Sequence, residues 1–328
     1  MPCPRLSIDS DRIFFITRAM GFRIGGTPIF IPAGGYPVVL LSGIPICDML
    51  IRQTKADKPG KTGGETVKNR LIQIAQEAGA FFRRDELTDV VSKEGHANYV
   101  TNIDCKVQAF LEKELLQLLP GSEFIGEEKE NQDLTDEPTW IVDPLDGTTN
   151  MIHDYRMSAV SIALCRNKKP VIGLVWQPFT QELFYAEEGR GAFLNDRPIH
   201  VSDTPFRNAL VAVGTAPYYE ELEDTGMKLA SEFLHQCADI RRSGSAALDL
   251  AYLACGRHDI FFELRLKPWD YAAGSLIVQE AGGLVQMPLA DGKMDYNLST
   301  AILSANSQCM PTALKVFRET VLPDLRKE

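Results

Sequence analysis

The spacing of apolar residues changes along the chain, and this change limits the folds that the chain can adopt. Over residues 65–84 and 103–118, apolar residues recur every three or four positions, which predicts two amphipathic helices. From Glu123 onward the pattern breaks into short apolar segments, which are typical of strands. Strands and helices are then mixed without an internal repeat. Such a mixture predicts an α/β or α+β fold built from packed layers.

The predicted elements after Pro120-Gly121, where the second helix ends, are short. Predicted strands cover residues 123–126, 139–142, 158–165, 171–176, 182–186, 208–213, 259–263 and 301–304. Predicted helices cover residues 221–237, 245–254 and 269–281. The sequence contains neither GxGxxG nor GxxxxGKS/T, so a nucleotide-binding function is not favoured.

The first 64 residues follow no sustained helical or strand period. Proline and glycine interrupt the apolar residues between positions 27 and 51, and residues 55–64 are typical of a linker. We therefore expect an N-terminal extension over residues 1–64 and a folded domain over residues 65–328. The extension is either specific to the species or a product of translation assigned from an upstream start. In the second case Met49 is a possible internal start.

Composition excludes some classes of partner. The formal net charge of -10 disfavours nucleic acid as the main partner, because an acidic surface repels a phosphate backbone. No apolar run reaches the roughly 18 residues of a membrane span, and signal-peptide organisation is poor, so we expect no membrane partner. Seven scattered cysteines without C-x-x-C spacing indicate free thiols and a cytoplasmic protein.

Three acidic groups, far apart in the sequence, each lie at an end of a predicted strand or helix. They are Glu127 with Glu128, Asp143 with Asp146, and Asp270. Ligand sites of layered α/β proteins gather at such ends, and carboxylate oxygens are the ligands that Mg²⁺ prefers. Each group alone is more simply a turn, a solvated pair or a helix cap. Together they shift the balance toward a metal site, while a merely acidic surface stays the alternative.

Directly after Asp146, the segment Gly147-Thr148-Thr149 is expected to begin a helix. A glycine followed by hydroxyl residues at a helix start presents backbone N–H groups that bind phosphate oxygens. One short loop therefore offers both metal ligands and a phosphate-binding cradle.

Taken together, these segments resemble the inositol monophosphatase family. The matching motifs are G-E-E at 126–128, W-I-V-D-P-L-D-G-T-T-N at 140–150 and W-D-Y-A-A-G-S-L-I-V-Q-E-A-G-G at 269–283. The resemblance extends from about residue 65 to the C-terminus. It implies a layered α-β-α-β-α sandwich of the sugar-phosphatase type, commonly a homodimer. It also implies a lithium-sensitive, magnesium-dependent phosphatase.

The resemblance implies a role for each matching residue. The ligands of two or three Mg²⁺ ions would be Glu127, Asp143, the carbonyl of Leu145, Asp146 and Asp270. The catalytic residues would be Glu128, which assists a water on the metal, and the pair Asp104 and Thr148, which helps to deprotonate the attacking water. Substrate would be bound by Asp146, by the backbone N–H groups of Gly147 and Thr148, and at the sugar ring by Ala246 and Glu263. Lys93 corresponds to a lysine on a flap before the second helix.

The chain departs from the family pattern directly after D-G-T-T-N. Met151 stands where an aromatic residue is usual, and Arg156 stands where proline is common. These departures bear on substrate choice more than on chemistry.

We expect hydrolysis of a small phosphate monoester, foremost myo-inositol monophosphate to inositol and phosphate. A second hypothesis is another sugar-phosphate phosphatase, such as a fructose-1,6-bisphosphatase, although Glu263 favours the first. A third hypothesis, from another class, is a regulatory binding protein that uses a phosphatase fold. The presence of every expected metal ligand argues against a loss of activity.

Overall fold

A computed structural model describes residues 23–24, 27–28, 67–93, 98–129 and 131–325. Within residues 1–45, β1 (Arg23–Ile24) and β2 (Thr27–Pro28) pair antiparallel. The other residues of the expected extension, including the possible start Met49, lie outside the described residues. The remaining elements belong to a second unit, residues 46–328.

A seven-stranded sheet of order β11-β10-β9-β8-β7-β6-β5 forms one layer of this second unit. Only β5 and β6 pair in parallel, and the other neighbours in this sheet pair antiparallel. Its strands are β5 (Glu123–Gly126), β6 (Thr139–Asp146), β7 (Ala159–Arg166), β8 (Lys169–Gln177), β9 (Glu182–Glu187), β10 (Ala192–Leu194) and β11 (Arg197–Ile199).

A five-stranded sheet of order β13-β12-β14-β16-β15 forms a second layer. In this sheet β12 pairs in parallel with β13 and β14, whereas β16 pairs antiparallel with β14 and β15. Its strands are β12 (Leu210–Val213), β13 (Asp239–Arg241), β14 (Ile260–Leu266), β15 (Leu284–Gln286) and β16 (Thr300–Ala305).

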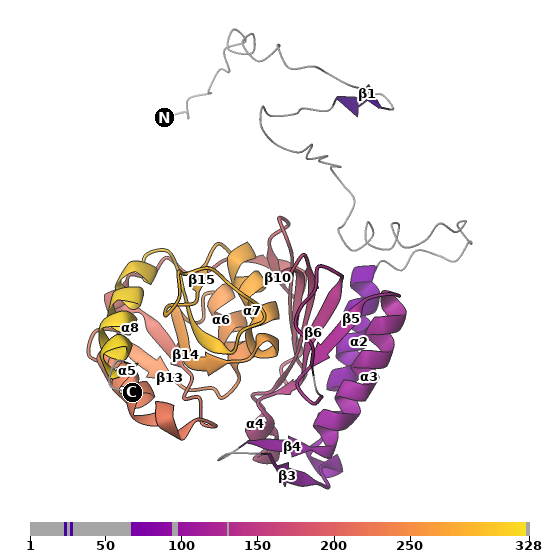
Figure 1. Cartoon of the computed structure of the whole chain (residues 1–328), viewed down its shortest axis with the longest axis horizontal. Coiled ribbons are helices and arrows are strands. Elements are labelled where there is room, and N and C mark those ends of the chain that lie inside the picture. The colour runs from indigo at the N-terminus through magenta and orange to yellow at the C-terminus, as the bar shows by residue number, and fades with distance from the viewer. Residues whose placement is uncertain (1–22, 25–26, 29–66, 94–97, 130, 326–328) are drawn as a thin grey trace, which may run out of the picture. The chain divides into compact units, whose positions relative to one another are not determined.

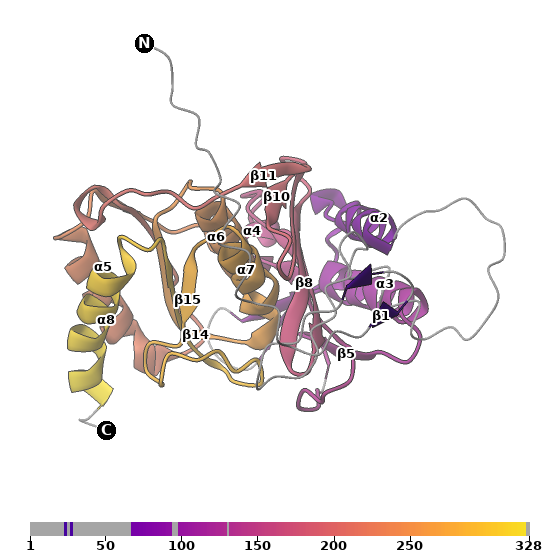
Figure 2. The same cartoon turned by 90° about the horizontal axis from the view of Figure 1, so that it is seen from above.

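Helices cover both sheets and complete five layers, as Figures 1 and 2 show. The outer pair α2 and α3 lies on one face of the seven-stranded sheet, α6 and α7 lie between the sheets, and α5 and α8 cover the five-stranded sheet. The helices are α2 (Val67–Gly79), α3 (Asn102–Leu118), α4 (Thr148–Ile152), α5 (Glu223–Leu234), α6 (Ala246–Ala254), α7 (Pro268–Glu280) and α8 (Met310–Leu325). The expected α-β-α-β-α sandwich is confirmed.

Apolar side chains fill each space between layers. Leu71, Leu111 and Trp140 are buried between α2, α3 and the seven-stranded sheet. On the far side, the Phe262 ring lies with its centroid 4.7 Å from Phe233 and 6.3 Å from Phe317. Because the seven-stranded sheet is covered on both faces, its central strands are apolar almost continuously and do not alternate.

The structure corrects some of the predicted boundaries. The first helix ends at Gly79, before Arg84, and short turns lead to the 3-10 segment η2 (Arg84–Glu86). A Cβ at Gly79 would lie 2.4 Å from Nε1 of Trp176, so a glycine is needed where the end of this helix meets the sheet. The strand predicted to end at residue 142 continues to Asp146, because β7 still pairs with it across a register shift.

Several elements have no counterpart in the sequence prediction. They are the β3 (Val90–Ser92) and β4 (Tyr99–Thr101) hairpin, β10, β11, β13, β15, the 3-10 segment η3 (Phe206–Asn208) and α8, whereas the 3-10 segment η4 (Glu220–Leu222) overlaps the start of the helix predicted from residue 221. Each of these strands has only three residues, too few for a period to be recognised. Cys165, Cys237 and Cys309 are buried free thiols. No helix in the described part of the chain is long and apolar enough to cross a membrane.

Candidate active site

A pocket of about 530 Å³ opens where the ends of β5, β6 and β14 meet the start of α7. Predicted site residues form much of its lining: Glu127, Asp143, Leu145, Asp146, Gly147, Thr148, Glu263 and Asp270. Ala246 lines an adjoining cavity of about 180 Å³, which shares Asp146 and Glu263 with the pocket. The two remaining predicted residues, Asp104 and Glu128, line neither cavity but contact residues that do.

Glu127 and Glu128 directly follow β5. The carbonyl of Val142 accepts a hydrogen bond from the Glu127 N–H, and the Gln108 side chain on α3 accepts one from the Glu128 N–H. A Cβ at Gly126 would lie 2.5 Å from the same Gln108 side chain, so the glycine of the G-E-E motif allows α3 to approach. The structure therefore gives the first residue of this motif a packing role.

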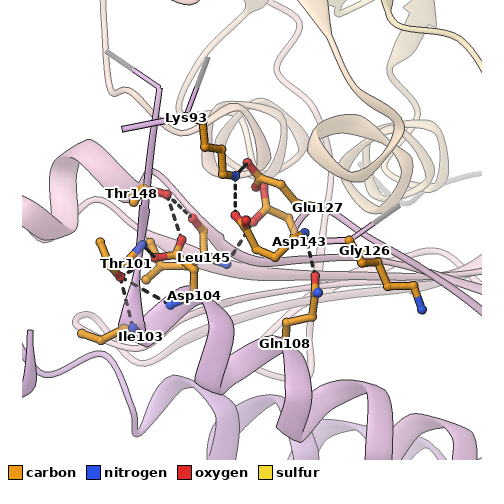
Figure 3. Close-up of polar contacts among 12 residues, drawn as sticks. Lys93, Thr101, Ile103, Asp104, Gln108, Gly126, Glu127, Asp143, Leu145 and Thr148 are labelled. Carbon is orange, nitrogen blue, oxygen red and sulfur yellow. Dashed lines mark hydrogen bonds and ion pairs between the residues drawn. The ribbon is translucent and has the colours of Figure 1, made fainter. Parts of the chain in front are cut away.

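Lys93 follows β3 and pairs with both glutamates. Its Nζ lies 3.1 Å from Oε1 of Glu127, a contact that Figure 3 shows, and 2.6 Å from Oε1 of Glu128. Burial, followed by the neighbouring charge of Glu127, raises the pKa of Glu128 to about 7, although the Lys93 ammonium group acts to lower it. The lysine is the cation that balances this part of the pocket in the described structure.

Asp143 and Asp146 lie in β6 at the shift in register with β7. Oδ1 of Asp143 accepts a hydrogen bond from the Leu145 N–H at 2.9 Å, which fixes the backbone around the intervening proline. Oδ2 of Asp146 accepts from Ser245 Oγ and, at 2.8 Å, from the Ala247 N–H. The bonds to Asp146 come from α6 and its N-cap, so the middle helix layer positions this carboxylate.

Gly147 and Thr148 begin α4 as expected. Gly147 has φ of 89°, and a Cβ there would lie 2.7 Å from the carbonyl oxygen of Met157, so only glycine fits this turn. The N–H groups at the start of α4 have no partners within the helix. They are therefore available to an anion.

The Thr148 hydroxyl connects β6 to α3 (Figure 3). Its Oγ lies 3.0 Å from Oδ1 of Asp104 and 3.2 Å from the carbonyl oxygen of Leu145. Oδ2 of Asp104 accepts from both the N–H and the hydroxyl of Thr101, in the capping box that begins α3. Burial nonetheless raises the pKa of Asp104, so this carboxylate has a greater proton affinity than an exposed one.

Asp270 completes the acidic cluster from the first turn of α7. Its Oδ2 accepts a hydrogen bond from the Lys267 N–H at 2.6 Å. Burial raises the pKa values of Asp143 and Asp270 well above the ordinary range, and the neighbouring charges of Glu127 and Asp146 raise them further. Burial also raises the pKa of Asp146 to about 6. These carboxylates repel one another, and a divalent cation would relieve that repulsion.

The chemistry of this set fits a hard divalent cation. Asp143, Asp270 and Glu127 each use one named oxygen in the bonds described above, which orients the other oxygen of the carboxylate. Among the described residues, however, no three His, Cys, Asp or Glu side chains form a preassembled metal cage. Lys93 pairs with Glu127, while α6 and its N-cap hold Asp146.

Glu263 reaches the pocket from β14 in the other sheet. Its Oε1 accepts a hydrogen bond from the Ala216 N–H at 2.8 Å. A Cβ at Gly214 would lie 2.1 Å from Oε2, so a glycine is needed beside this carboxylate. Burial raises the pKa of Glu263 to about 7.

Sequence reasoning missed several residues of the pocket wall. Tyr218 and Tyr219 lie after β12, and Arg265 and Lys267 lie at the end of β14. Arg265 and Lys267 follow Glu263 closely in the sequence, but β14 shifts register with β16 between Glu263 and Leu266, so alternation alone could not place them.

The fold and the pocket together define a phosphate-ester hydrolase of the layered sugar-phosphatase type. The sequence model of the inositol monophosphatase family matches residues 64–322, and the chain belongs to this family. It is a phosphatase, and members of the family are generally metal-dependent.

Individual relatives agree with this assignment. The chain is 42% identical over 257 residues to inositol monophosphatase 3 of Solanum lycopersicum, covering 76% of this chain and 95% of the relative. It is 35% identical over 264 residues to Nus factor SuhB of Escherichia coli K12, covering 79% and 98%. The solved structure of the suhB protein of Bartonella henselae superposes with a TM-score of 0.72 at 37% identity, covering 78% and 99%.

Proposed function

We propose that the chain hydrolyses small phosphate monoesters with Mg²⁺, foremost myo-inositol monophosphate to inositol and phosphate. The observation that carries this proposal is that one pocket is lined by the acidic cluster, by the glycine turn at Gly147 and by Thr148, whose hydroxyl is bonded to Asp104. Phosphate-monoester hydrolysis is among the slowest uncatalysed reactions. Charge neutralisation and water activation are therefore both needed in that pocket.

The metal ligands in this proposal are Glu127, Asp143, the carbonyl of Leu145, Asp146 and Asp270. When bound there, Mg²⁺ neutralises phosphoryl oxygens and lowers the pKa of water. The Thr148 hydroxyl lies 3.2 Å from the carbonyl oxygen of Leu145 but donates its one hydrogen to Asp104, so this carbonyl keeps its lone pairs for a cation. Glu128, which Lys93 and α3 hold in place, would assist a water beside the cluster.

The proposed proton path uses Thr148 and Asp104. The Thr148 hydroxyl donates to Oδ1 of Asp104, so its oxygen remains able to accept a proton from an attacking water. The proton then passes to Asp104, whose raised pKa favours uptake. The N–H groups of Gly147 and Thr148 would hold the phosphate, while Glu263 and Ala246 would contact the ring.

A second candidate function comes from another class. One relative is named Nus factor SuhB, which is not the name of a phosphatase. A binding protein on this fold would not need the acidic cluster, yet the cluster is complete in this chain. We therefore place hydrolysis first and a binding role second.

Four finer features belong to the same proposal: a homodimer, inhibition by lithium, a cytoplasmic location, and a working domain over residues 65–328. The family match to residues 64–322 supports the last of these. A chain that begins near Gly63 is expected to fold and to keep its turnover. Loss of either property would show that the preceding residues take part in the working structure.

Phosphate release from a panel of inositol and sugar phosphates tests the proposed function. We expect release from inositol monophosphate with Mg²⁺ and none when EDTA removes the metal. Full activity in EDTA would exclude the metal site. Release from sugar phosphates alone would favour the other sugar-phosphate phosphatases.

A further inference from the structure

One buried acid beside the pocket is not used by the proposed catalysis. Asp249 lies in the first turn of α6, three residues after Ala246, so both residues lie on one face of this helix. Both line the adjoining cavity of about 180 Å³, which Glu263 also lines. Asp249 therefore borders the same cavity as the two residues that are proposed to contact the ring.

The carboxylate of Asp249 is buried without a full set of partners. The residue is only 2% exposed, and its Oδ1 accepts no hydrogen bond from any described residue. It is the one charged side chain of α6, and its neighbours Leu248 and Leu250 are buried apolar residues. Burying a charged group without partners is costly, so an unpaired acid of this kind calls for a partner from outside the protein.

His258 faces this carboxylate from the segment between α6 and β14. Its Nε2 lies 3.5 Å from Oδ1 of Asp249, too far for a well-formed hydrogen bond, and neither ring nitrogen has a hydrogen-bond partner among the described residues. Burial raises the pKa of Asp249, and the neighbouring His258 opposes this rise only in part. Since His258 lies on the side of Oδ1, Oδ2 is the oxygen that can serve the cavity.

A hydroxyl group is the hydrogen-bond donor that suits this cavity. Arg242 also lines the cavity, and its Nη2 donates to the Thr215 hydroxyl at 3.1 Å. The guanidinium group would repel an ammonium group or a metal cation, whereas Asp249 and Glu263 would repel a second anionic group. A hydroxyl group is neutral and donates one hydrogen bond, so it meets neither repulsion.

We propose that Asp249 accepts a hydrogen bond from a ring hydroxyl group of the substrate, and that His258 positions its carboxylate. The proposal rests on the proposed function and narrows its substrate class to phosphate esters of polyol rings. Asp249 lies on α6 and Glu263 on β14, so the two acids would accept from different hydroxyl groups of one ring. An analogue that lacks the hydroxyl group would leave the buried acceptor unpaired.

The test uses inositol 1-phosphate and its monodeoxy analogues, each of which lacks one ring hydroxyl group. The wild type is expected to lose about tenfold or more in kcat/KM with the analogue that lacks the partner of Asp249. Asp249→Ala should erase the sensitivity at this one ring position, because the acceptor is already gone. Glu263→Gln should weaken the sensitivity at a different position. If Asp249→Ala kept the wild-type sensitivity at every position, the contact would be overturned.

Two further variants sharpen the comparison. Asp249→Asn preserves the shape of the side chain and gives the same comparison if Asp249→Ala does not fold. Its amide oxygen still accepts, so part of the sensitivity should remain. His258→Phe removes the group that faces Oδ1 while keeping a ring, and it should weaken the sensitivity at the same ring position. Weakening at every position alike would show that His258 only supports packing.

Glu187→Gln is the matched control. Glu187 is also buried, its Oε2 likewise has no hydrogen-bond partner among the described residues, and Nε of Arg190 lies 3.5 Å from this oxygen. It lines neither cavity of the site. We expect Glu187→Gln to keep the wild-type sensitivity at every ring position. Loss of the same sensitivity in Glu187→Gln and Asp249→Ala would overturn the contact.

A binding measurement separates this proposal from the proposed function. If the wild-type protein cleaves none of these esters, the proposed function fails, and calorimetric titration with inositol 1-phosphate then decides the contact. Binding that is about tenfold weaker in Asp249→Ala than in Glu187→Gln supports it. Equal binding by the two variants, or no binding by the wild type, overturns it.

Discussion

The two sheets contribute differently to the pocket. The seven-stranded sheet supplies Glu127, Asp143 and Asp146, whose charges repel one another and are balanced only in part by Lys93. The five-stranded sheet supplies Glu263, which has a backbone N–H donor, and Arg265, which has its own carboxylate partner. The first side thus holds several carboxylates that repel one another, whereas the second side holds one buried carboxylate, whose pKa burial also raises, and a cation with a carboxylate partner. We infer that the first side carries the chemistry and the second side selects the substrate.

The largest effect is expected on the first side. Asp143→Asn should lower the rate of hydrolysis by about 10³-fold or more, because a lost ligand weakens a metal that contributes several kcal/mol. Stability in the absence of metal should not fall, since the substitution removes a repelled charge and opens no cavity. The measurements are initial rates over a Mg²⁺ titration and thermal unfolding.

Asp259→Asn is the control for Asp143→Asn. Asp259 is a buried aspartate whose carboxylate accepts hydrogen bonds from Ser202 and from the Leu210 N–H, far from the pocket lining. It should lose stability and keep its rate per folded molecule. If both variants lost stability and rate alike, Asp143 would be structural and the contrast between the sheets would not hold.

The second-largest effect is expected at Thr148, which lies on the side of the seven-stranded sheet but is proposed to activate the attacking water. Thr148→Ala should reduce kcat by roughly 10²–10⁴-fold with little change in the Mg²⁺ requirement, because it removes the hydroxyl that passes a proton to Asp104. A Mg²⁺ titration of the initial rate shows whether Thr148 activates the water or binds the metal. An unchanged kcat with a much greater Mg²⁺ requirement would assign Thr148 to the metal.

These contrasts show what the sequence could and could not predict. Motif spacing placed the acidic cluster at element ends, and the structure brings these residues to one pocket. Local periodicity could not show that Ser245 and the Ala247 N–H bond to Asp146 from about a hundred residues away. Nor could it show that Lys93 pairs with both glutamates. Such contacts depend on how the layers pack.

The same reasoning explains the elements that were missed. Helix α8 buries Ala313, Val316, Phe317, Thr320 and Val321, a helical spacing that was present in the sequence but was not recognised. The β3–β4 hairpin gave no such signal, because Val90 and Val91 are exposed and the strands have three residues each. Strand β3 is exposed throughout, and β4 buries only Thr101, so neither strand has an alternating buried face from which a period could be read.

A smaller effect is expected on the second side. Glu263→Gln should reduce kcat/KM for inositol monophosphate by about tenfold while reducing that for a simple aryl phosphate less, since only the first has hydroxyl groups for this carboxylate to accept. Rates on both substrates give the result. Equal losses would show that Glu263 does not contact the substrate and acts instead through its charge on the acidic cluster.

The smallest effect is a change in stability with pH, and it tests whether the carboxylates of the two sheets have different roles. Burial raises the pKa of Asp146 to about 6 and that of Glu263 to about 7 in the folded protein, above their values in an unfolded chain near 4. Between these values the folded state binds more protons than the unfolded state, so stability without metal falls as pH rises from about 4 to about 7.

Metal ligands must be deprotonated, so Mg²⁺ should raise the melting temperature more at about pH 8 than at about pH 5. Glu263→Gln should flatten the decline without metal and keep the Mg²⁺ effect, because Glu263 is not a proposed ligand. Asp143→Asn should reduce the Mg²⁺ effect itself. If Glu263→Gln reduced the Mg²⁺ effect as much as Asp143→Asn, the two sheets would share one metal site and the division between chemistry and selection would fail.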